Sequence, residues 1–334
     1  MPTPATSRST RVDGVGALVV GGAGFIGSHV VDGLLMRGAS RVTVFDNFSS
    51  GRRWRLAHVN DPRLEVIAGD VHDLSALARA MRDSTLVFHL ASNPDISRAE
   101  LDPDIDFREG TELTRNVLEA MRQCGAKRIF YTSGSGVYGD LGERPATEDH
   151  GPLVPISTYG ASKLAGEALI SSYGFMFGIE GRVFRLGNVV GPRQSHGVGF
   201  DFIRRLLVDP TRLRILGDGR QSKPYVDVSE VVDAMFFVHS LELGRFEVFN
   251  VATQDALTVT EIAELARSTV GTENVSYEYS GSDRGWRGDI PIVRLSSAKL
   301  AAAGFELESS SRAAMSRALA ALAEEVRRGV DRLE

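Results

Sequence analysis

Two side chains in the stretch STYGASKLAGE are of the types that move protons to and from alcohols. Tyr159 precedes Lys163 by four residues, and residues at this spacing share one face of a helix. An ammonium group beside a phenol favours the phenolate, so it lowers the pKa of the tyrosine from its ordinary value of about 10. Such a phenolate acts as a general base on an alcohol. Because the Tyr-x-x-x-Lys spacing is common by chance on helix surfaces, its interpretation depends on what else the chain supplies.

A glycine-rich segment near the N-terminus has the spacing of a phosphate-binding turn. Gly21, Gly24 and Gly27 lie in VVGGAGFIGSH, between an apolar run and a segment with helical spacing. Phosphates need close approach to the backbone and free N–H groups at the start of a helix, and glycines at these positions permit both. A tight turn with a purely structural role is the less favoured alternative, because a strand is expected before the glycines and a helix after them.

An acidic residue ends the next apolar run, as a dinucleotide site requires. Asp46 follows Gly27 by 19 residues, and a carboxylate there bonds both ribose hydroxyls and repels a 2′-phosphate, which favours NAD over NADP. Asp70, at the end of the third apolar run, is a candidate for the adenine end, although a helix cap explains it nearly as well. The nearby arginines favour NADP instead, since Arg accepts a 2′-phosphate; they are Arg52, Arg53 and Arg55.

The stretch YTSGSGVYGD, residues 131–140, concentrates hydroxyls and glycines upstream of the tyrosine. It follows a short apolar run, and its first charged residue is Asp140. Gly134 precedes Tyr159 by 25 residues. Together with the glycine-rich turn and the Tyr–Lys pair, this stretch is typical of the lip of an active site rather than of a flexible turn.

Short strands alternate with helices over the first two thirds of the chain, which predicts a parallel sheet covered on both faces. Beyond residue 191 the pattern becomes richer in loops, and a serine is the expected N-cap of the C-terminal helix. The expected strands are 17–22, 41–46, 63–70, 85–92, 126–133, 180–188 and 245–252. The expected helices are 25–38, 72–83, 110–125, 158–174, 200–210, 228–243 and 309–333.

Composition limits the class of protein. The 334 residues are 43% hydrophobic and 24% charged, with a net charge of -5. The densest basic patch, GRRWR, is too short to follow a nucleic-acid backbone. No apolar run approaches the roughly 18 residues of a membrane span. The single cysteine, Cys124, excludes an intrachain disulfide and suits a reducing, cytoplasmic location. No His, Cys and carboxylate cluster predicts a metal site, and residues 1–14 are expected to be a flexible tail.

A set of motifs, found in family order over roughly residues 16 to 300, resembles the extended short-chain dehydrogenases/reductases, in the branch of NAD-dependent nucleotide-sugar epimerases and dehydratases. The motifs are GGAGFIGSH, DNFSSG, AGDV, HLAS, VYGD, STYGASKLAGE, RLGNVVGPRQ, GDGRQSKPYVDV and RGWRGDIP. The resemblance implies a Rossmann-type doubly wound sheet with a smaller C-terminal α/β domain for a nucleoside-diphosphate sugar. The domains would be 15–187 with a returning segment near 225–252, and 188–224 with 253–334.

The resemblance also implies a tightly held NAD and a homodimer formed through a four-helix bundle, here from the helices near 105–124 and 158–174. Its cofactor contacts map onto Gly21, Gly24, Phe25, Ile26, Gly27, Asp46, Asn47, Ser49, Gly51, Asp70, Val71, Leu90, Ala91, Ser92, Tyr159 and Lys163.

The residues before VYGD bear on the reaction. In the family, the phenolate takes the C4 hydroxyl proton of the sugar while hydride passes to NAD. Dehydratases and decarboxylases of the family carry an acidic residue just before VYG. Here Ser135 and Gly136 stand there, which favours return of the hydride to the other face, a 4-epimerisation. A sugar-nucleotide 4-reductase or dehydrogenase is the alternative enzyme, and a non-catalytic NAD sensor is the alternative without chemistry.

The chain departs from the family at two positions. Gly134 stands where epimerases have a Ser or Thr that bonds the reacting hydroxyl, so Ser133 is the expected replacement and Ser135 the next choice. Gly110 stands where relatives have an Asn, so one side-chain bond near the cofactor is expected to be missing.

The substrate residues are expected from the resemblance. Lys223 keeps a charge where relatives have a diphosphate Arg, although Lys lacks its bidentate fork. Arg185, Arg193 and His196 lie near the expected sugar pocket and slightly favour UDP-glucuronate/UDP-galacturonate over UDP-glucose/UDP-galactose. The full expected set is Ser133, Ser135, Tyr159, Asn188, Arg193, Lys223, Arg284 and Arg287, the two last flanking Trp286.

Overall fold

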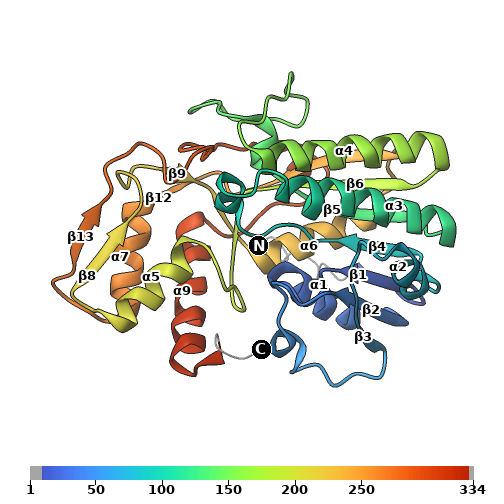
Figure 1. Cartoon of the computed structure of the whole chain (residues 1–334), viewed down its shortest axis with the longest axis horizontal. Helices are drawn as coiled ribbons and strands as arrows, with labels where there is room; N and C mark the ends of the chain where they lie inside the picture. The colour runs from blue at the N-terminus through green and yellow to red at the C-terminus, as the bar shows by residue number, and fades with distance from the viewer. Residues whose placement is uncertain (1–9, 331–334) are drawn as a thin grey trace, which may run out of the picture.

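The computed structural model describes residues 10–330, and at its centre lies a seven-stranded parallel sheet (Figure 1). The strands are β1 (Gly16–Val20), β2 (Arg41–Asp46), β3 (Leu64–Ala68), β4 (Leu86–His89), β5 (Arg128–Gly134), β6 (Glu180–Leu186) and β11 (Phe246–Val251). Their order is β11-β6-β5-β4-β1-β2-β3. The winding direction reverses between β1 and β4, and such a switch point opens a ligand crevice outside the carboxyl ends of the strands. The predicted doubly wound sheet is confirmed.

Helices cover both faces of this sheet. Helices α1 (Phe25–Met36) and α6 (Val228–His239) lie on one face, and α2 (Leu74–Met81), α3 (Leu113–Cys124) and α4 (Thr158–Phe177) lie on the other. Successive strand side chains point to opposite faces, so the buried residues of one strand are shared between two cores. Val19 of β1 packs toward α1 and α6, whereas Leu18 and Val20 pack toward the other helices. Burial on both faces explains why these strands read as continuous apolar runs.

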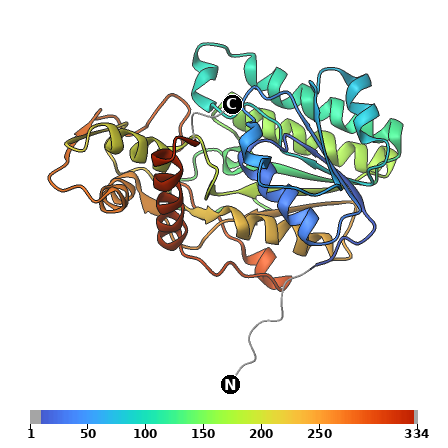
Figure 2. The same ribbon diagram turned by 90° about the horizontal axis from the view of Figure 1, so that it is seen from below.

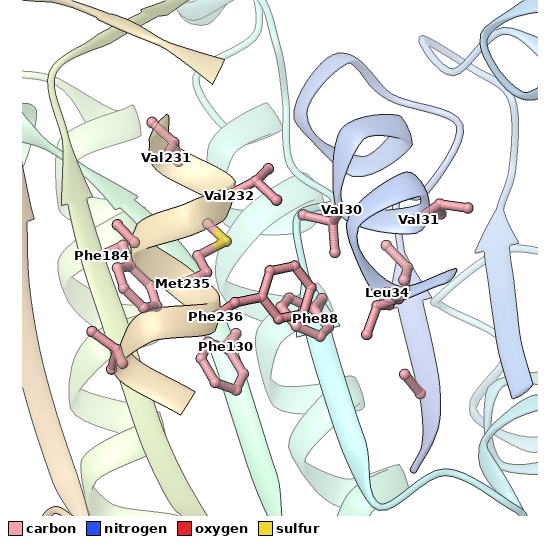
Figure 3. Close-up of a cluster of buried hydrophobic side chains, with 14 of the residues drawn as sticks. Val30, Val31, Leu34, Phe88, Phe130, Phe184, Val231, Val232, Met235 and Phe236 are labelled. Atoms are coloured by element: carbon pink, nitrogen blue, oxygen red, sulfur yellow. The ribbon is translucent and has the colours of Figure 1, made fainter. Parts of the chain in front are cut away.

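The core between the sheet and the α1/α6 layer is rich in aromatic rings. Figure 3 shows Phe88, Phe130 and Phe184 of adjacent strands facing the helices, with Phe236 of α6 beside them. The rings of Phe88 and Phe130 are stacked, with centroids 4.8 Å apart. This layer holds α6 against the sheet, although α6 follows the sixth strand by more than forty residues in sequence.

A smaller α/β unit lies to one side of the sheet (Figures 1 and 2). It contains the parallel pair β8 (Arg212–Ile215) and β13 (Ser276–Tyr279), which lies at its outer edge in Figure 1. Helices α5 (Val198–Val208), α7 (Val259–Val270) and α9 (Ser311–Arg327) share a separate apolar core with this pair. The short elements are η1 (Arg53–Leu56), η2 (Ile96–Glu100), η3 (Phe107–Glu112), η4 (Ser135–Tyr138), β7 (Asn188–Val190), β9 (Ser222–Lys223), β10 (Tyr225–Asp227), β12 (Leu257–Thr258) and α8 (Ala298–Ala302).

The termini and caps add detail to the predictions. Ser310 caps α9, its side chain accepting a hydrogen bond from the Ala313 N–H, so a serine N-cap is confirmed. The predicted tail of residues 1–14 is too long. Residues 1–9 lie outside the described part of the chain, but Val12 is buried and its N–H donates to the Arg37 carbonyl. The exact domain boundaries stay a prediction. Within residues 10–330, no helix is long and apolar enough to cross a bilayer.

Candidate active site

The glycine-rich turn between β1 and α1 brings the backbone unusually close to a neighbouring loop. Gly21 has a φ of 82°, and a Cβ built on it would lie 2.7 Å from the Ala91 backbone nitrogen. A Cβ on Gly27 would lie 2.2 Å from the Gly21 carbonyl oxygen. Helix α1 starts directly after Gly24, so its first N–H groups face the carboxyl edge of the sheet. This is the backbone cradle that a dinucleotide pyrophosphate requires.

Asp46, at the end of β2, is held in place beside this turn. Its carboxylate accepts hydrogen bonds from the backbone N–H groups of Ala23, at 2.9 Å, and Phe48, at 2.8 Å. Gly51 faces it so closely that a Cβ there would lie 2.5 Å from Oδ1. Burial raises the pKa of Asp46, and the two backbone donors oppose that rise. The carboxylate is therefore fixed where ribose hydroxyls need an acceptor.

The three arginines after Asp46 have different surroundings, and Arg53 is exposed. Arg55 is buried, and it donates to the carbonyls of Ala23 and Ser50 at 3.0 and 3.2 Å. Burial lowers its pKa to about 10. Arg52 donates to the Gly51 carbonyl at 2.9 Å. Arg55 is therefore a structural link between the turn and its surroundings, and not an acceptor of a 2′-phosphate.

The residues expected at the adenine end lie after β3. Asp70 accepts hydrogen bonds from the His72 N–H at 2.9 Å and from the Asn47 amide at 3.4 Å. The N-cap of α2 is Asp73, whose side chain accepts from the Ala76 N–H. The alternative explanation of Asp70 as the helix cap is therefore wrong. The other predicted cofactor residues also gather at this edge, since Phe25 and Ile26 open α1, Ser49 follows β2, Val71 follows β3, and Leu90, Ala91 and Ser92 follow β4.

Tyr159 and Lys163 lie on the first turns of α4, as predicted, after the Ser157 side chain caps the helix. The Lys163 ammonium donates a 2.9 Å hydrogen bond to the Thr132 carbonyl at the end of β5. It lies 5.5 Å from the centre of the Tyr159 ring. Burial lowers the pKa of Lys163 to about 8. The strand end thus fixes the ammonium beside the phenol.

The expected lowering of the Tyr159 pKa is not found. Burial and, next in size, the negative charge of Asp106 raise this pKa to about 12, although a side-chain interaction with Ser92 opposes the rise. Asp106 is itself buried, and it accepts hydrogen bonds from the Asn93 amide at 2.9 Å and the Thr158 hydroxyl at 2.7 Å. Loss of hydration therefore outweighs the neighbouring ammonium.

Asp106 was not among the predicted site residues. It lies between Ile105 and Phe107, and its two partners are 13 and 52 residues away in sequence. No local pattern marks such a residue. Its charge acts on both members of the Tyr–Lys pair, because it raises the pKa values of Tyr159 and Lys163 alike.

Two serines flank Gly134 in YTSGSGVYGD. Ser133 is buried, and its hydroxyl donates to the Glu167 carboxylate at 2.5 Å, inside the layer between β5 and α4. A Cβ built on Gly134 would meet no heavy atom within 4 Å. Ser135 is half-buried at the start of η4. The Ser133 hydroxyl is thus not brought to Tyr159, whereas position 134 faces open space.

The second departure, Gly110, lies within the π-helical turn η3 just before α3. A Cβ on Gly110 would lie 2.2 Å from the Ser162 hydroxyl oxygen. Ser162 in turn accepts a 3.1 Å hydrogen bond from the Thr111 hydroxyl. The space that a larger side chain would need is therefore filled from α4. Extra residues in a helical turn of this kind are frequent at functional sites.

The residues expected to bind the diphosphate lie in the smaller unit and its connections. Lys223 forms a 2.6 Å ion pair with Asp289, and its ammonium lies 5.2 Å from the centre of the Trp286 ring. Arg284 forms a 2.8 Å ion pair with Asp140, directly after VYG. Arg287 is exposed, and Asn188 is half-buried at the start of β7. Lys223, Trp286 and Arg284 therefore form one group, joined through Asp289 and its neighbours.

Two arginines expected near the sugar are bound elsewhere. Arg185 forms a buried 2.7 Å ion pair with Glu167, and it donates to the Tyr138 hydroxyl at 2.9 Å. Arg193 has a left-handed φ of 66°, and its guanidinium bonds Asp32 and His29 of α1. Both guanidinium groups thus serve the fold in this structure and are not presented to a sugar. The third residue expected near the sugar, His196, is exposed.

No metal centre accompanies these groups. Among residues 10–330, no three His, Cys, Asp or Glu side chains are placed to hold an ion.

A parallel sheet with this cradle and a Tyr–Lys pair at its carboxyl edge defines a nucleotide-binding α/β enzyme, and sequence comparison gives the family. Residues 17–252 match the model of the NAD dependent epimerase/dehydratase family. The chain belongs to this family of enzymes, and its cofactor is NAD, which the cradle and Asp46 fit.

The similar proteins differ in the reactions that their names state. The chain is 35% identical over 262 residues to a UDP-glucose 4-epimerase of Mycolicibacterium smegmatis, a match that covers 76% of this chain and 82% of that protein. It is 32% identical over 261 residues to UDP-glucuronic acid decarboxylase 1 of Arabidopsis thaliana, covering 76% and 58%. The structure of MoeE5 in complex with UDP-glucuronic acid and NAD superposes with a TM-score of 0.81 at 26% identity, covering 94% of this chain and 99% of MoeE5.

Proposed function

We propose that this protein interconverts the 4-epimers of a UDP-sugar, with UDP-glucose and UDP-galactose as the substrate pair. The observation that carries the proposal is the arrangement of Tyr159, Lys163 and the Thr132 carbonyl beside the dinucleotide cradle. Bound NAD supplies a reversible hydride acceptor. The chain's own residues then have to hold the sugar and move one proton at its C4 oxygen.

The proton transfer is assigned to Tyr159. Its phenolate oxygen takes the proton of the C4 hydroxyl as hydride leaves C4, and it returns that proton when the hydride comes back to the other face. Lys163 keeps a positive charge next to the phenol, which favours the phenolate. The Thr132 carbonyl holds that ammonium in place through its 2.9 Å hydrogen bond.

The residues before VYG support epimerisation over elimination. Loss of a substituent from the 4-keto sugar needs an additional acid or base, and positions 133–136 carry only serine and glycine. The acid that does lie close in sequence, Asp140, is held in an ion pair with Arg284. Return of a hydride to the other face of C4 would need no further acid.

The choice of sugar follows from the cations. A uronate needs a positive charge near its C6 carboxylate. Arg185, Arg193 and His196 were the reason to favour a uronate, and the two arginines are bound to carboxylates of the fold. The relative from Mycolicibacterium smegmatis is named a UDP-glucose 4-epimerase. A neutral hexose is therefore the better proposal, with its diphosphate near Lys223, Arg284 and Arg287 and Asn188 at the start of β7.

A homodimer through α3 and α4 is part of the same proposal. Phe175 and Met176, near the end of α4, are 69% and 70% exposed. Large apolar side chains in such a position are stabilised when a partner covers them. We expect light scattering to give the mass of a dimer, and Phe175→Glu with Met176→Glu to give a monomer. A wild-type monomer would contradict this part. The cytoplasmic location stays a prediction.

The test of function uses purified protein without added cofactor. UDP-glucose, UDP-galactose and UDP-glucuronate are incubated separately, and the products are resolved by chromatography and NMR. We expect UDP-galactose and UDP-glucose to interconvert, with little net change in absorbance at 340 nm. Stoichiometric absorbance change would instead identify a 4-reductase or dehydrogenase. A faster reaction of UDP-glucuronate would overturn the choice of sugar.

A further inference from the structure

Two adjacent residues at the end of β5 bond two residues of α4 that lie one helical turn apart. The Thr132 carbonyl accepts a 2.9 Å hydrogen bond from the Lys163 ammonium. The next residue, Ser133, donates from its hydroxyl to the Glu167 carboxylate at 2.5 Å. Residues at the spacing of 163 and 167 share one face of a helix. The end of β5 is therefore fastened to α4 at two neighbouring points, one of which is the lysine of the Tyr–Lys pair.

Helix α4 approaches β5 closely between these two points. A Cβ built on Gly166 would lie 2.5 Å from the Tyr131 hydroxyl oxygen and 2.8 Å from the ring carbon that carries it. The Tyr131 side chain is buried, so it cannot move out of the way. Direct contact thus sets the distance between strand and helix, and the two hydrogen bonds fix how the helix lies along the strand.

The Glu167 carboxylate is also held from the neighbouring strand. Arg185 on β6 is the register partner of Ser133, and its guanidinium bonds Glu167 at 2.7 Å. Arg185 also donates to the Tyr138 hydroxyl, which donates to the Asn250 side chain at 2.8 Å. All five of these side chains are buried. A carboxylate held by both a guanidinium and a hydroxyl has little freedom to turn, so Glu167 is a fixed anchor for the end of β5.

Glu167 also contributes to the electrostatics of Lys163. Burial lowers the pKa of the lysine to about 8, while the negative charges of Asp106 and Glu167 oppose that fall. The other groups close to the ammonium are the uncharged rings of Tyr131, Tyr159 and His89. Glu167 is therefore the acid of α4 that helps to keep the ammonium charged, and its hydrogen bond with Ser133 holds that negative charge in a fixed position.

We propose that Ser133 and Glu167 are positioning residues for Lys163. Their hydrogen bond fixes the end of β5 on α4, so that the Thr132 carbonyl holds the ammonium beside Tyr159. The inference rests on the proposed function, because Lys163 acts there by favouring the phenolate. Ser133 thus has a role other than the sugar contact that its place in the sequence suggests, and it acts through the lysine without touching the substrate.

The test uses the protein with its bound NAD and two variants, Ser133→Ala and Glu167→Gln. Thr211→Ala is the control, because it removes a 2.6 Å hydroxyl–carboxylate bond, to Asp209, in the smaller unit. This control should change none of the readouts. The kcat and KM of epimerisation are measured across pH, and melting temperature and NAD content identify a misfolded variant.

A second readout needs no substrate. The chain has four lysines, Lys127, Lys163, Lys223 and Lys299, so labelling the lysine Cε atoms with carbon-13 gives one NMR signal for each. Lys163→Met identifies the signal of Lys163, and the change of that signal with pH reports the pKa of the ammonium. The other three lysines serve as internal controls.

We expect Ser133→Ala to lower kcat by about tenfold with KM unchanged, because a small displacement of the lysine is costly whereas substrate binding is untouched. The Lys163 signal should move, since the ammonium loses its fixed position. Glu167→Gln should in addition lower the pKa of Lys163, because a negative charge beside it is removed. The basic limb of the pH–rate profile, where the ammonium loses its proton, then moves to lower pH. The acid limb should stay, since the charge that acts on Tyr159 is that of Asp106.

Ser133→Ala with the wild-type kcat, or with an unmoved Lys163 signal, would overturn the inference. A folded Glu167→Gln protein in which Lys163 titrates as in wild type would do the same. If Glu167→Gln does not fold, because Arg185 then lacks its buried partner, Ser133→Ala decides alone. Failure of the proposed function has a different signature: wild type forms no 4-epimer, while the Lys163 signal still responds to both substitutions.

Discussion

The Lys163 ammonium lies 5.5 Å from the centre of the Tyr159 ring, one helical turn further along α4. A 2.9 Å hydrogen bond to the Thr132 carbonyl holds it there. Burial and the charge of Asp106 nevertheless raise the pKa of the phenol to about 12. The ammonium and the phenol are thus held near each other in a buried environment that disfavours the phenolate.

Removal of the phenol oxygen should abolish catalysis without removing the fold. We expect Tyr159→Phe to reduce kcat by about 10³-fold or more, because the proton of the sugar alcohol loses its acceptor. Bound NAD and the melting temperature should stay near wild type. The measurement is the initial rate of epimerisation, with NAD quantified after denaturation. A variant that retains a tenth of the wild-type rate would show that another group is the base.

Asp106→Asn should move both limbs of the pH–rate profile to lower pH. The Asp106 carboxylate raises the pKa of Tyr159 and of Lys163. Its neutralisation favours the phenolate, so the acid limb moves down, and it favours the neutral amine, so the basic limb also moves down. Asp104→Asn is the matched control, since Asp104 is exposed. An unmoved acid limb would show that the charge does not reach the base.

Asp46→Asn should weaken the binding of NAD and reduce the preference for NAD over NADP. The N–H groups of Ala23 and Phe48 hold the carboxylate, so its negative charge has a fixed position. Loss of a charge-assisted hydrogen bond costs about 1.5–3 kcal/mol, or roughly ten- to a hundredfold in affinity. Calorimetry with apoprotein measures both cofactors. An equal loss of affinity for NAD and for NADP would contradict a role of Asp46 in discriminating between the two cofactors.

Arg185→Met should destabilise the protein rather than change its substrate. Arg185 and Glu167 are 5% and 4% exposed, and removing one partner of such a buried pair costs about 3–5 kcal/mol. The Arg312–Glu261 pair, which is 55% and 42% exposed, supplies the control, and Arg312→Met should cost less than about 1 kcal/mol. Denaturant unfolding measures both. A stable Arg185→Met protein with altered activity on UDP-glucuronate would instead indicate that Arg185 contacts the sugar.

Much of this architecture could be predicted because strand and helix periodicities are local. Each of the seven predicted strands begins within two residues of its observed start. Helix α7 was missed although a capping box, Thr258 with Glu261, marks its start. The close approach of Ser162 to Gly110 could not be foreseen, because it brings together two helices that are distant in sequence.

The site was predictable to the level of backbone and motif, but not of side-chain direction. The Tyr–Lys pair and the glycine cradle follow from spacing along one element. Whether Ser133 faces the sugar or Glu167 depends on which face of β5 it occupies. The hydrogen bond of Arg193 to Asp32 depends on the left-handed backbone at Arg193. Such choices are made by tertiary packing, and they are where the expected substrate residues and the structure diverge.

The central claim, a 4-epimerase with Tyr159 as its base, is tested most directly by isotope transfer. UDP-galactose labelled with deuterium at C4 is incubated with protein that carries its own bound NAD, in ordinary water. The account predicts that the wild-type protein forms UDP-glucose that retains the deuterium at C4. It predicts that Tyr159→Phe does not form this product. A product without the 4-epimer, or one in which the deuterium has been lost to water, would contradict it.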